Sequence, residues 1–208
     1  VIYGIFRLVD SLKDEHEQLY ASLFAYNNFI AEFNSADPQR LIGLGLLPCH
    51  SPESAVAEVK RIGKHGLGLK GAEFAFAYAS QPIWDDIWEP LWAAAQDLEI
   101  PLNMHIGTNR PHAGQEFLDF ESASRTFFSN VDHWIRMSTG DMIFSGVFER
   151  FPNLQIGSVE FELSWVPHFL ERLDFNYNER SGRNEMYRFK EDMLPSDYFH
   201  RNVFLGFQ

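Results

Sequence analysis

Residues 100–112, which read I-P-L-N-M-H-I-G-T-N-R-P-H, decide the fold that we expect for this chain. The apolar residues Leu102, Met104 and Ile106 are typical of a buried strand, and a loop rich in Gly, Thr, Asn and Pro follows them. His105 stands at the end of this predicted strand. In a parallel α/β barrel the strand ends form the active-site face, so an imidazole there is placed to bind a metal or act as a base. A core histidine bonded to neighbouring backbone is the alternative interpretation.

Strand and helix patterns alternate along the chain. Short apolar runs predict strands at residues 1–6, 41–47, 67–70, 102–106, 154–161 and 202–207, with a loop at 71–82. Apolar residues at steps of three and four predict helices at about residues 13–34, 51–63, 85–99, 127–137, 141–151 and 165–176. Strict alternation indicates a parallel α/β sheet. Because no Gly-rich phosphate loop follows the first strand, the order fits most of a TIM barrel better than a Rossmann sheet.

Composition narrows the class of protein. The 208 residues are enough for one domain with a sizeable core. The formal net charge of −12 argues against a nucleic-acid partner and against binding to an anionic membrane surface. Cys49 is the single cysteine, which is consistent with a reducing compartment, and we expect a cytoplasmic protein. No apolar run approaches the roughly 18–20 residues of a membrane span.

Four segments carry a resemblance to a known family. They are R-L-I-G-L-G-L-L-P at residues 40–48, P-I-W-D-D-I-W-E-P-L-W-A-A-A-Q-D-L-E-I-P-L-N-M-H at 82–105, G-V-F-E-R-F-P-N-L-Q-I at 146–156 and S-W-V-P-H-F-L-E-R-L-D at 164–174. In this order the chain resembles the amidohydrolase-related metal-dependent hydrolases, in the branch that includes aminocarboxymuconate-semialdehyde and resorcylate-type decarboxylases. The resemblance implies a distorted (β/α)8 TIM barrel. Residues 1–208 would be a single barrel domain, incomplete at both ends and covering about strands two to seven.

The resemblance also implies a divalent metal, with zinc as the expected ion and manganese as the alternative. The family holds its metal with a His-x-His pair on the first strand, a His on the fifth and an Asp on the eighth. His105 matches the fifth-strand ligand, whereas the pair and the Asp have no counterpart in this sequence. The decarboxylases carry a His at the end of the sixth strand, where this chain has Glu160. A carboxylate does not donate a proton as imidazolium does near neutral pH, so hydrolysis is favoured over decarboxylation.

Four further residues are candidates for binding the substrate. His50 follows the predicted strand at 41–47, and Glu73 follows the short run at 67–70. Arg110 and His112 lie in the long loop after His105, and the fork of an arginine suits a substrate carboxylate because it binds two oxygens at once. For each of them, a loop residue satisfied by solvent or by backbone is the alternative.

Three functions are therefore open. The first is a metal-dependent hydrolase of a small acyl, lactone or aromatic carboxylate substrate, with His105 as metal ligand and His105 and Glu160 as catalytic residues that face one cleft. Non-oxidative decarboxylation on the same metal is the close alternative. A metal-free barrel that binds a ligand without turnover represents another class. We expect a small-molecule substrate as the partner, and a homodimer is one assembly to consider.

Overall fold

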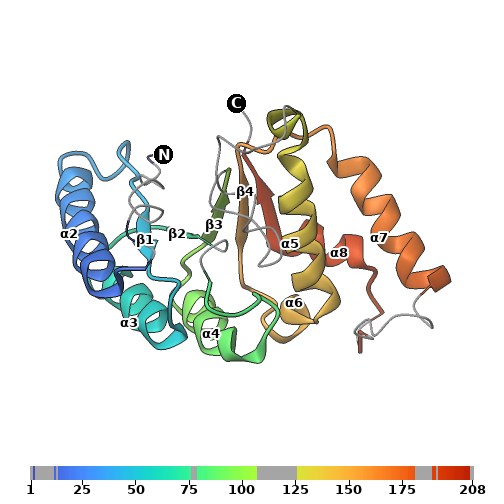
Figure 1. Ribbon diagram of the computed structural model, residues 1–208, viewed down its shortest axis with the longest axis horizontal. Coiled ribbons are helices and arrows are strands. Elements are labelled where there is room, and N and C mark those ends of the chain that lie inside the picture. Colours follow the sequence, from blue (N-terminus) through green and yellow to red (C-terminus); the bar gives the residue numbers. More distant parts are fainter. Residues whose placement is uncertain are drawn as a thin grey trace.

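A parallel sheet of five strands organises the structure (Figure 1). The computed structural model describes residues 2, 12, 14–75, 79–106, 126–180, 189–190 and 192–206. The strands are β1 (Gly45–Leu47), β2 (Ala72–Phe74), β3 (Leu102–His105), β4 (Ile156–Val159) and β5 (Val203–Leu205). They lie side by side in sequence order and all pairs are parallel. The parallel α/β sheet predicted from the alternation of patterns is therefore confirmed.

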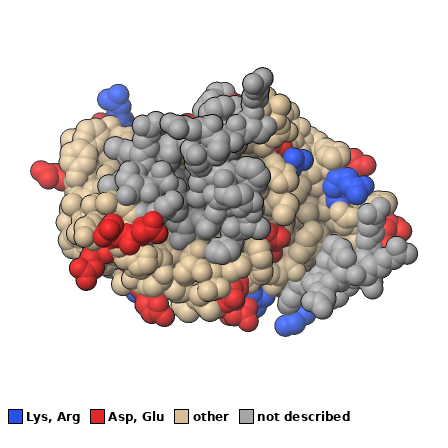
Figure 2. All heavy atoms as spheres, in the orientation of Figure 1, with Lys and Arg blue, Asp and Glu red and all other residues tan. Residues whose placement is uncertain are grey.

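Helices connect these strands. They are α2 (His16–Ser35), α3 (Pro52–Ile62), α4 (Glu89–Asp97), α5 (Asp132–Phe144), α6 (Val147–Arg150), α7 (Val166–Arg180) and α8 (Pro195–Asn202), with 3-10 turns η2 (Asp86–Trp88) and η4 (Phe127–Asn130). Figure 1 shows α2 and α3 at one end of the sheet and α7 at the other. Among the described residues, no helix combines the length and the apolar character needed to cross a membrane. Figure 2 shows acidic side chains spread around the margin of one face, in keeping with the net charge of −12.

Helix α3 forms where its capping sequence predicts it. The side chain of Ser51 accepts a hydrogen bond from the Ser54 N–H, and Pro52 occupies the first turn, where its missing N–H costs nothing. Ala55, Val59 and Ile62 form the buried face at steps of four and three. This start fixes the position of the segment that links β1 to α3, which contains His50.

One predicted strand is wrong. The run at residues 67–70 is a turn that closes α3, and the strand lies at β2, inside the segment predicted to be a loop. Gly68 adopts a left-handed φ of 72°, and the N–H groups of Leu67 and Leu69 donate to Arg61 and Ile62 at the end of α3. Because those donors are used there, the run cannot join the sheet. Of the predicted strand at 1–6 only Ile2 is described, and it forms a parallel bridge with Gly43.

The two faces of the sheet have different neighbours. Phe74 of β2 points to the helices, because its ring makes edge contacts with the buried Trp88 and Trp92 at centroid distances of 5.1 and 6.0 Å. Successive side chains of a strand alternate between faces, so Glu73 lies on the opposite, inner face. By register, the inner face continues through Asn103 to His105 on β3. The candidate residues of β2 and β3 therefore share one side of the sheet.

Candidate active site

His105 and Glu160 meet at the ends of two adjacent strands. His105 is the last residue of β3 and is in register with Val159, the last residue of β4. Glu160 follows directly, and its Oε2 lies 3.3 Å from Nε2 of His105. Both side chains are partly buried. The structure thus brings together the two residues that the sequence singles out as catalytic.

The backbone orients the His105 ring. Nδ1 lies 2.8 Å from the carbonyl oxygen of Ile106. A carbonyl oxygen only accepts hydrogen bonds, so Nδ1 carries a proton and donates it. This leaves Nε2 directed at the Glu160 carboxylate. Metal-binding histidines commonly show the same arrangement, in which one ring nitrogen donates to backbone and the other faces the ion.

The turn that carries Glu160 is held in a conformation that non-glycine residues rarely adopt. Glu160 has a φ of 63° and Glu162 a φ of 57°, both in the left-handed region. Between them Phe161 is buried, and Trp165 Nε1 donates to the Glu162 carbonyl at 2.9 Å. Such backbone conformations persist only where packing enforces them, and they cluster at functional sites. Here the turn directs the Glu160 carboxylate toward His105.

Glu73 lies elsewhere than predicted. It is the central residue of β2, only 2% exposed, and stands in register with Leu46 and Asn103 rather than in a loop. A charged residue inside a short strand conceals the strand pattern, which explains the error. Burial, with a smaller contribution from the negative charge of Glu73, raises the pKa of the Tyr26 hydroxyl to about 12. Glu73 thus acts electrostatically on side chains around the inner face.

His50 pairs with a residue that the sequence did not single out. Its ring stacks on His16, the first residue of α2, at a centroid distance of 4.7 Å and an interplanar angle of 18°. Burial, and to a lesser extent the neighbouring His16, lowers the pKa of His50 below its usual value. Nδ1 of His50 is buried and makes no hydrogen bond within the described part of the chain. His16 gave no sequence signal because the two rings meet only through tertiary packing.

Arg110 and His112 lie outside the described residues, so their roles stay predictions. In the described part of the chain, no group of three or more His, Cys, Asp and Glu side chains is arranged to hold an ion. Catalytic zinc sites use three protein ligands and an open position. His105 Nε2 and Glu160 Oε2 converge as two donors, which fits part of such a site.

Comparison with known proteins identifies the family. A profile described as Amidohydrolase matches residues 11–188. The chain belongs to the amidohydrolase family. The chain is 28% identical over 153 residues to 2-amino-3-carboxymuconate-6-semialdehyde decarboxylase of Dictyostelium discoideum, over 68% of the chain and 40% of that protein. The branch that the sequence motifs predict is thereby confirmed.

Solved structures share the fold. The 5-carboxyvanillate decarboxylase LigW from Sphingomonas paucimobilis gives a TM-score of 0.72 at 26% identity, covering 86% of this chain and 52% of that chain. A 5-carboxyvanillate decarboxylase from Novosphingobium aromaticivorans, complexed with manganese and 4-hydroxy-3-methoxy-5-nitrobenzoic acid, gives 0.74 at 24% identity, covering 91% and 53%. The described sheet therefore corresponds to part of a TIM barrel, as predicted. The chain spans about half the length of the relatives it matches.

Proposed function

We propose that this chain is part of a metal-dependent, non-oxidative decarboxylase that acts on small organic carboxylates. The observation that carries the proposal is the His105–Glu160 contact of 3.3 Å at the ends of β3 and β4. Similarity to decarboxylases supports this reaction over the hydrolase that we preferred from the sequence. The relatives are named for different substrates, a muconate semialdehyde and a vanillate, so the proposal extends to the carboxylate class alone.

His105 is the residue that we assign to a divalent ion. Nε2 of His105 and Oε2 of Glu160 point at each other, and two such acceptor atoms are stabilised when a cation or a proton lies between them. A bound divalent ion would orient the substrate carboxylate and stabilise negative charge. Manganese in the Novosphingobium structure supports manganese over the zinc that we expected.

The reaction replaces a carboxylate by a proton. The bond between the substrate carbon and its carboxylate breaks, carbon dioxide leaves, and the electron pair stays on the carbon, which then takes a proton. Glu160 is the group that we assign to hold that proton at Oε2, because it lies at the strand end beside His105. The acid form of its carboxyl carries the proton that the carbon takes, in place of the imidazolium of the decarboxylases that have a His at this position. We assign His50, Glu73, Arg110 and His112 to substrate binding, as the sequence predicts. A small-molecule substrate and a cytoplasmic location complete the proposal.

The experiment that tests this function follows both products. The purified protein, loaded with manganese, is incubated in D2O with a panel of aromatic and muconate-type carboxylates. Decarboxylation gives carbon dioxide and a product with one deuterium at the former carboxylate position, both measurable by mass spectrometry. Hydrolysis of esters or lactones without release of carbon dioxide would instead support the hydrolase function. A protein that binds no stoichiometric metal and turns over neither class would support a non-catalytic binding barrel.

A further inference from the structure

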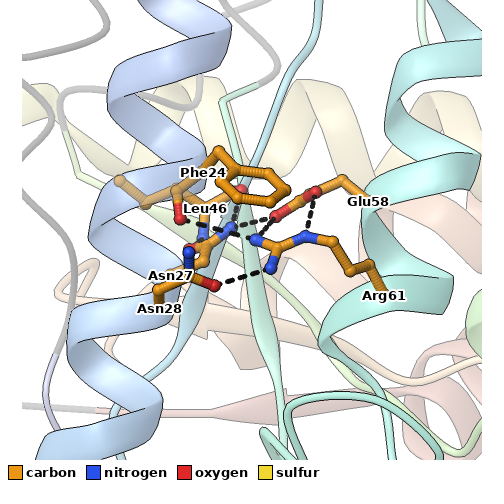
Figure 3. A network of polar contacts seen from close by, with 6 residues as sticks. All are labelled: Phe24, Asn27, Asn28, Leu46, Glu58 and Arg61. Atoms are coloured by element: carbon orange, nitrogen blue, oxygen red, sulfur yellow. Dashed lines mark hydrogen bonds and ion pairs between the residues drawn. The ribbon is translucent and has the colours of Figure 1, made fainter.

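A buried amide takes the place of a neighbouring strand beside β1 (Figure 3). The Leu46 N–H donates to Oδ1 of Asn27 at 2.7 Å, and Nδ2 of Asn27 donates to the Leu46 carbonyl at 2.9 Å. Asn27 belongs to α2 and is fully buried. A strand partner makes the same pair of bonds to a backbone. Through this one side chain, α2 is fixed to the middle of β1.

A buried ion pair fixes the orientation of that amide. Nδ2 of Asn27 also donates to Oε1 of Glu58 at 2.6 Å, and the Glu58 side chain is only 1% exposed. Arg61 donates to both carboxylate oxygens, through Nε at 2.9 Å and Nη2 at 2.6 Å. This bidentate geometry is the strong form of the pair. Glu58 and Arg61 lie on α3, so the contacts join α3 to α2 and β1.

Arg61 is itself held from two sides. Nη1 donates to Oδ1 of Asn28 at 2.7 Å, and the guanidinium carbon lies 3.7 Å from the centre of the Phe24 ring. Both partners belong to α2. We call Asn27, Glu58 and Arg61 the clamp. Its bonds fix α2, β1 and α3 relative to one another.

The same three elements carry the His16–His50 pair. His16 begins α2, whereas His50 lies between the end of β1 and Ser51, the N-cap of α3. The stacking of the two rings at 4.7 Å therefore depends on how α2 sits against the segment that joins β1 to α3. The clamp joins these same elements, α2, β1 and α3.

We propose that the clamp positions the His50 ring at the carboxyl end of β1 for contact with a substrate, and that His16 supports this ring by stacking on it. The proposal rests on the proposed function only in assigning His50 to the substrate. Asn27, Glu58 and Arg61 are positioning residues that act through His50. They are distinct from His105 and Glu160, which we assign to the reaction itself.

The test changes the clamp and reads His50 directly. In Glu58→Gln an amide NH2 would face the Arg61 donors, so the bidentate pair is lost while the side-chain shape is kept. We expect the nuclear Overhauser contact between the His16 and His50 rings to weaken or vanish, and the His50 titration midpoint to move up toward that of an ordinary histidine. Arg61→Lys keeps the charge but loses the fork, and should give a smaller change in the same direction even if Glu58→Gln does not fold.

The matched control is a second Arg–Glu pair. Nε of Arg150 donates to Glu89 at 2.6 Å and joins α6 to α4, two helices that carry no residue of the clamp. Glu89→Gln should leave both His50 readouts unchanged. Unchanged readouts in Arg61→Lys and in a folded Glu58→Gln would overturn the proposal, and so would equal changes in Glu89→Gln. None of these readouts needs substrate or metal, so failure of the decarboxylase assay is a separate result.

Discussion

At the scale of single residues, Glu160 combines a proposed role in the reaction with a strained backbone. Its φ of 63° is unfavourable for a side chain with a Cβ, and Glu162, two residues on, shares this feature at 57°. Of these two glutamates, Glu160 is the one whose carboxylate contacts His105. Glu160 and Glu162 therefore form a matched pair. Both have the same backbone conformation, but a role in the reaction is proposed for Glu160 and not for Glu162.

Replacing each glutamate by glycine distinguishes the effect of backbone strain on stability from the effect of the carboxylate on turnover. Glycine adopts a positive φ without steric cost, so we expect Glu162→Gly to raise the free energy of unfolding by about 0.5 kcal/mol and to leave turnover unchanged. Glu160→Gly should be equally tolerated in the fold but lose turnover by about 100-fold or more, because acid–base groups contribute that much. Denaturant unfolding measures the change in the free energy of unfolding, and a rate assay measures turnover. Normal turnover in Glu160→Gly would refute the role of its carboxylate.

Asp141 of α5 makes stability depend on pH. Burial raises the pKa of its carboxyl from 3.8 to about 6. The folded protein thus binds a proton more tightly than the unfolded chain, so this contribution to stability is present below the ordinary pKa and is lost as pH rises through 6. With a discount for partial exposure to solvent, Asp141→Asn should stabilise the protein by about 1 kcal/mol at pH 7.5.

Thermal unfolding at two pH values checks that effect. The two proteins should unfold at nearly the same temperature at pH 4, where the aspartate is largely protonated in the folded state. An equal gain at pH 4 and pH 7.5 would mean that ionisation of Asp141 does not cause the difference.

At the scale of elements, one layer of the sheet interior is tightly packed around Gly157 of β4. A methyl group there would overlap Oδ1 of Asn103 and come within 2.5 Å of Cζ of Phe204. The Asn103 amide cannot move freely, because Nδ2 donates to the Ala72 carbonyl at 3.0 Å. Gly157→Ala should therefore lower the free energy of unfolding by about 1–3 kcal/mol, as overpacked cores do. The control Gly140→Ala should not destabilise the protein, because the nearest atom is 3.7 Å away and alanine is favoured over glycine inside a helix such as α5.

The elements also show what the sequence can and cannot predict. Helix α3 was predictable because Ser51 and Pro52 are local signals of a helix start. β2 was not, since its central residue is the charged Glu73 and the apolar run before it is used to close α3. His105 was predictable as a strand-end residue. The partnership of His16 with His50 was not, because it arises only when α2 packs beside the end of β1.

At the scale of the whole molecule, the parallel sheet brings strand ends from distant parts of the sequence to one edge. His105 and Glu160 are separated along the chain by residues 106–159, which include α5 and α6, yet their side chains are in contact. If this edge holds a divalent ion, folding and metal binding are linked.

Metal binding should therefore raise the unfolding temperature. An ion that binds only the folded state at 100 times its dissociation constant adds about 2.7 kcal/mol of stability. We expect manganese to raise Tm of the purified protein and to have little effect on His105→Ala. A shift of equal size in His105→Ala would place the ion elsewhere.

Release of carbon dioxide tests whether His105 and Glu160 carry out the reaction. It is measured for the manganese-loaded parent protein, for His105→Ala and for Glu160→Gln, each at the substrate concentration that saturates the parent protein. We expect one carbon dioxide per molecule of product in the parent, and a rate lower by about 100-fold or more in each variant while the folded state is retained. Carbon dioxide released at the parent rate by either variant would contradict the assignment of the reaction to the His105–Glu160 pair.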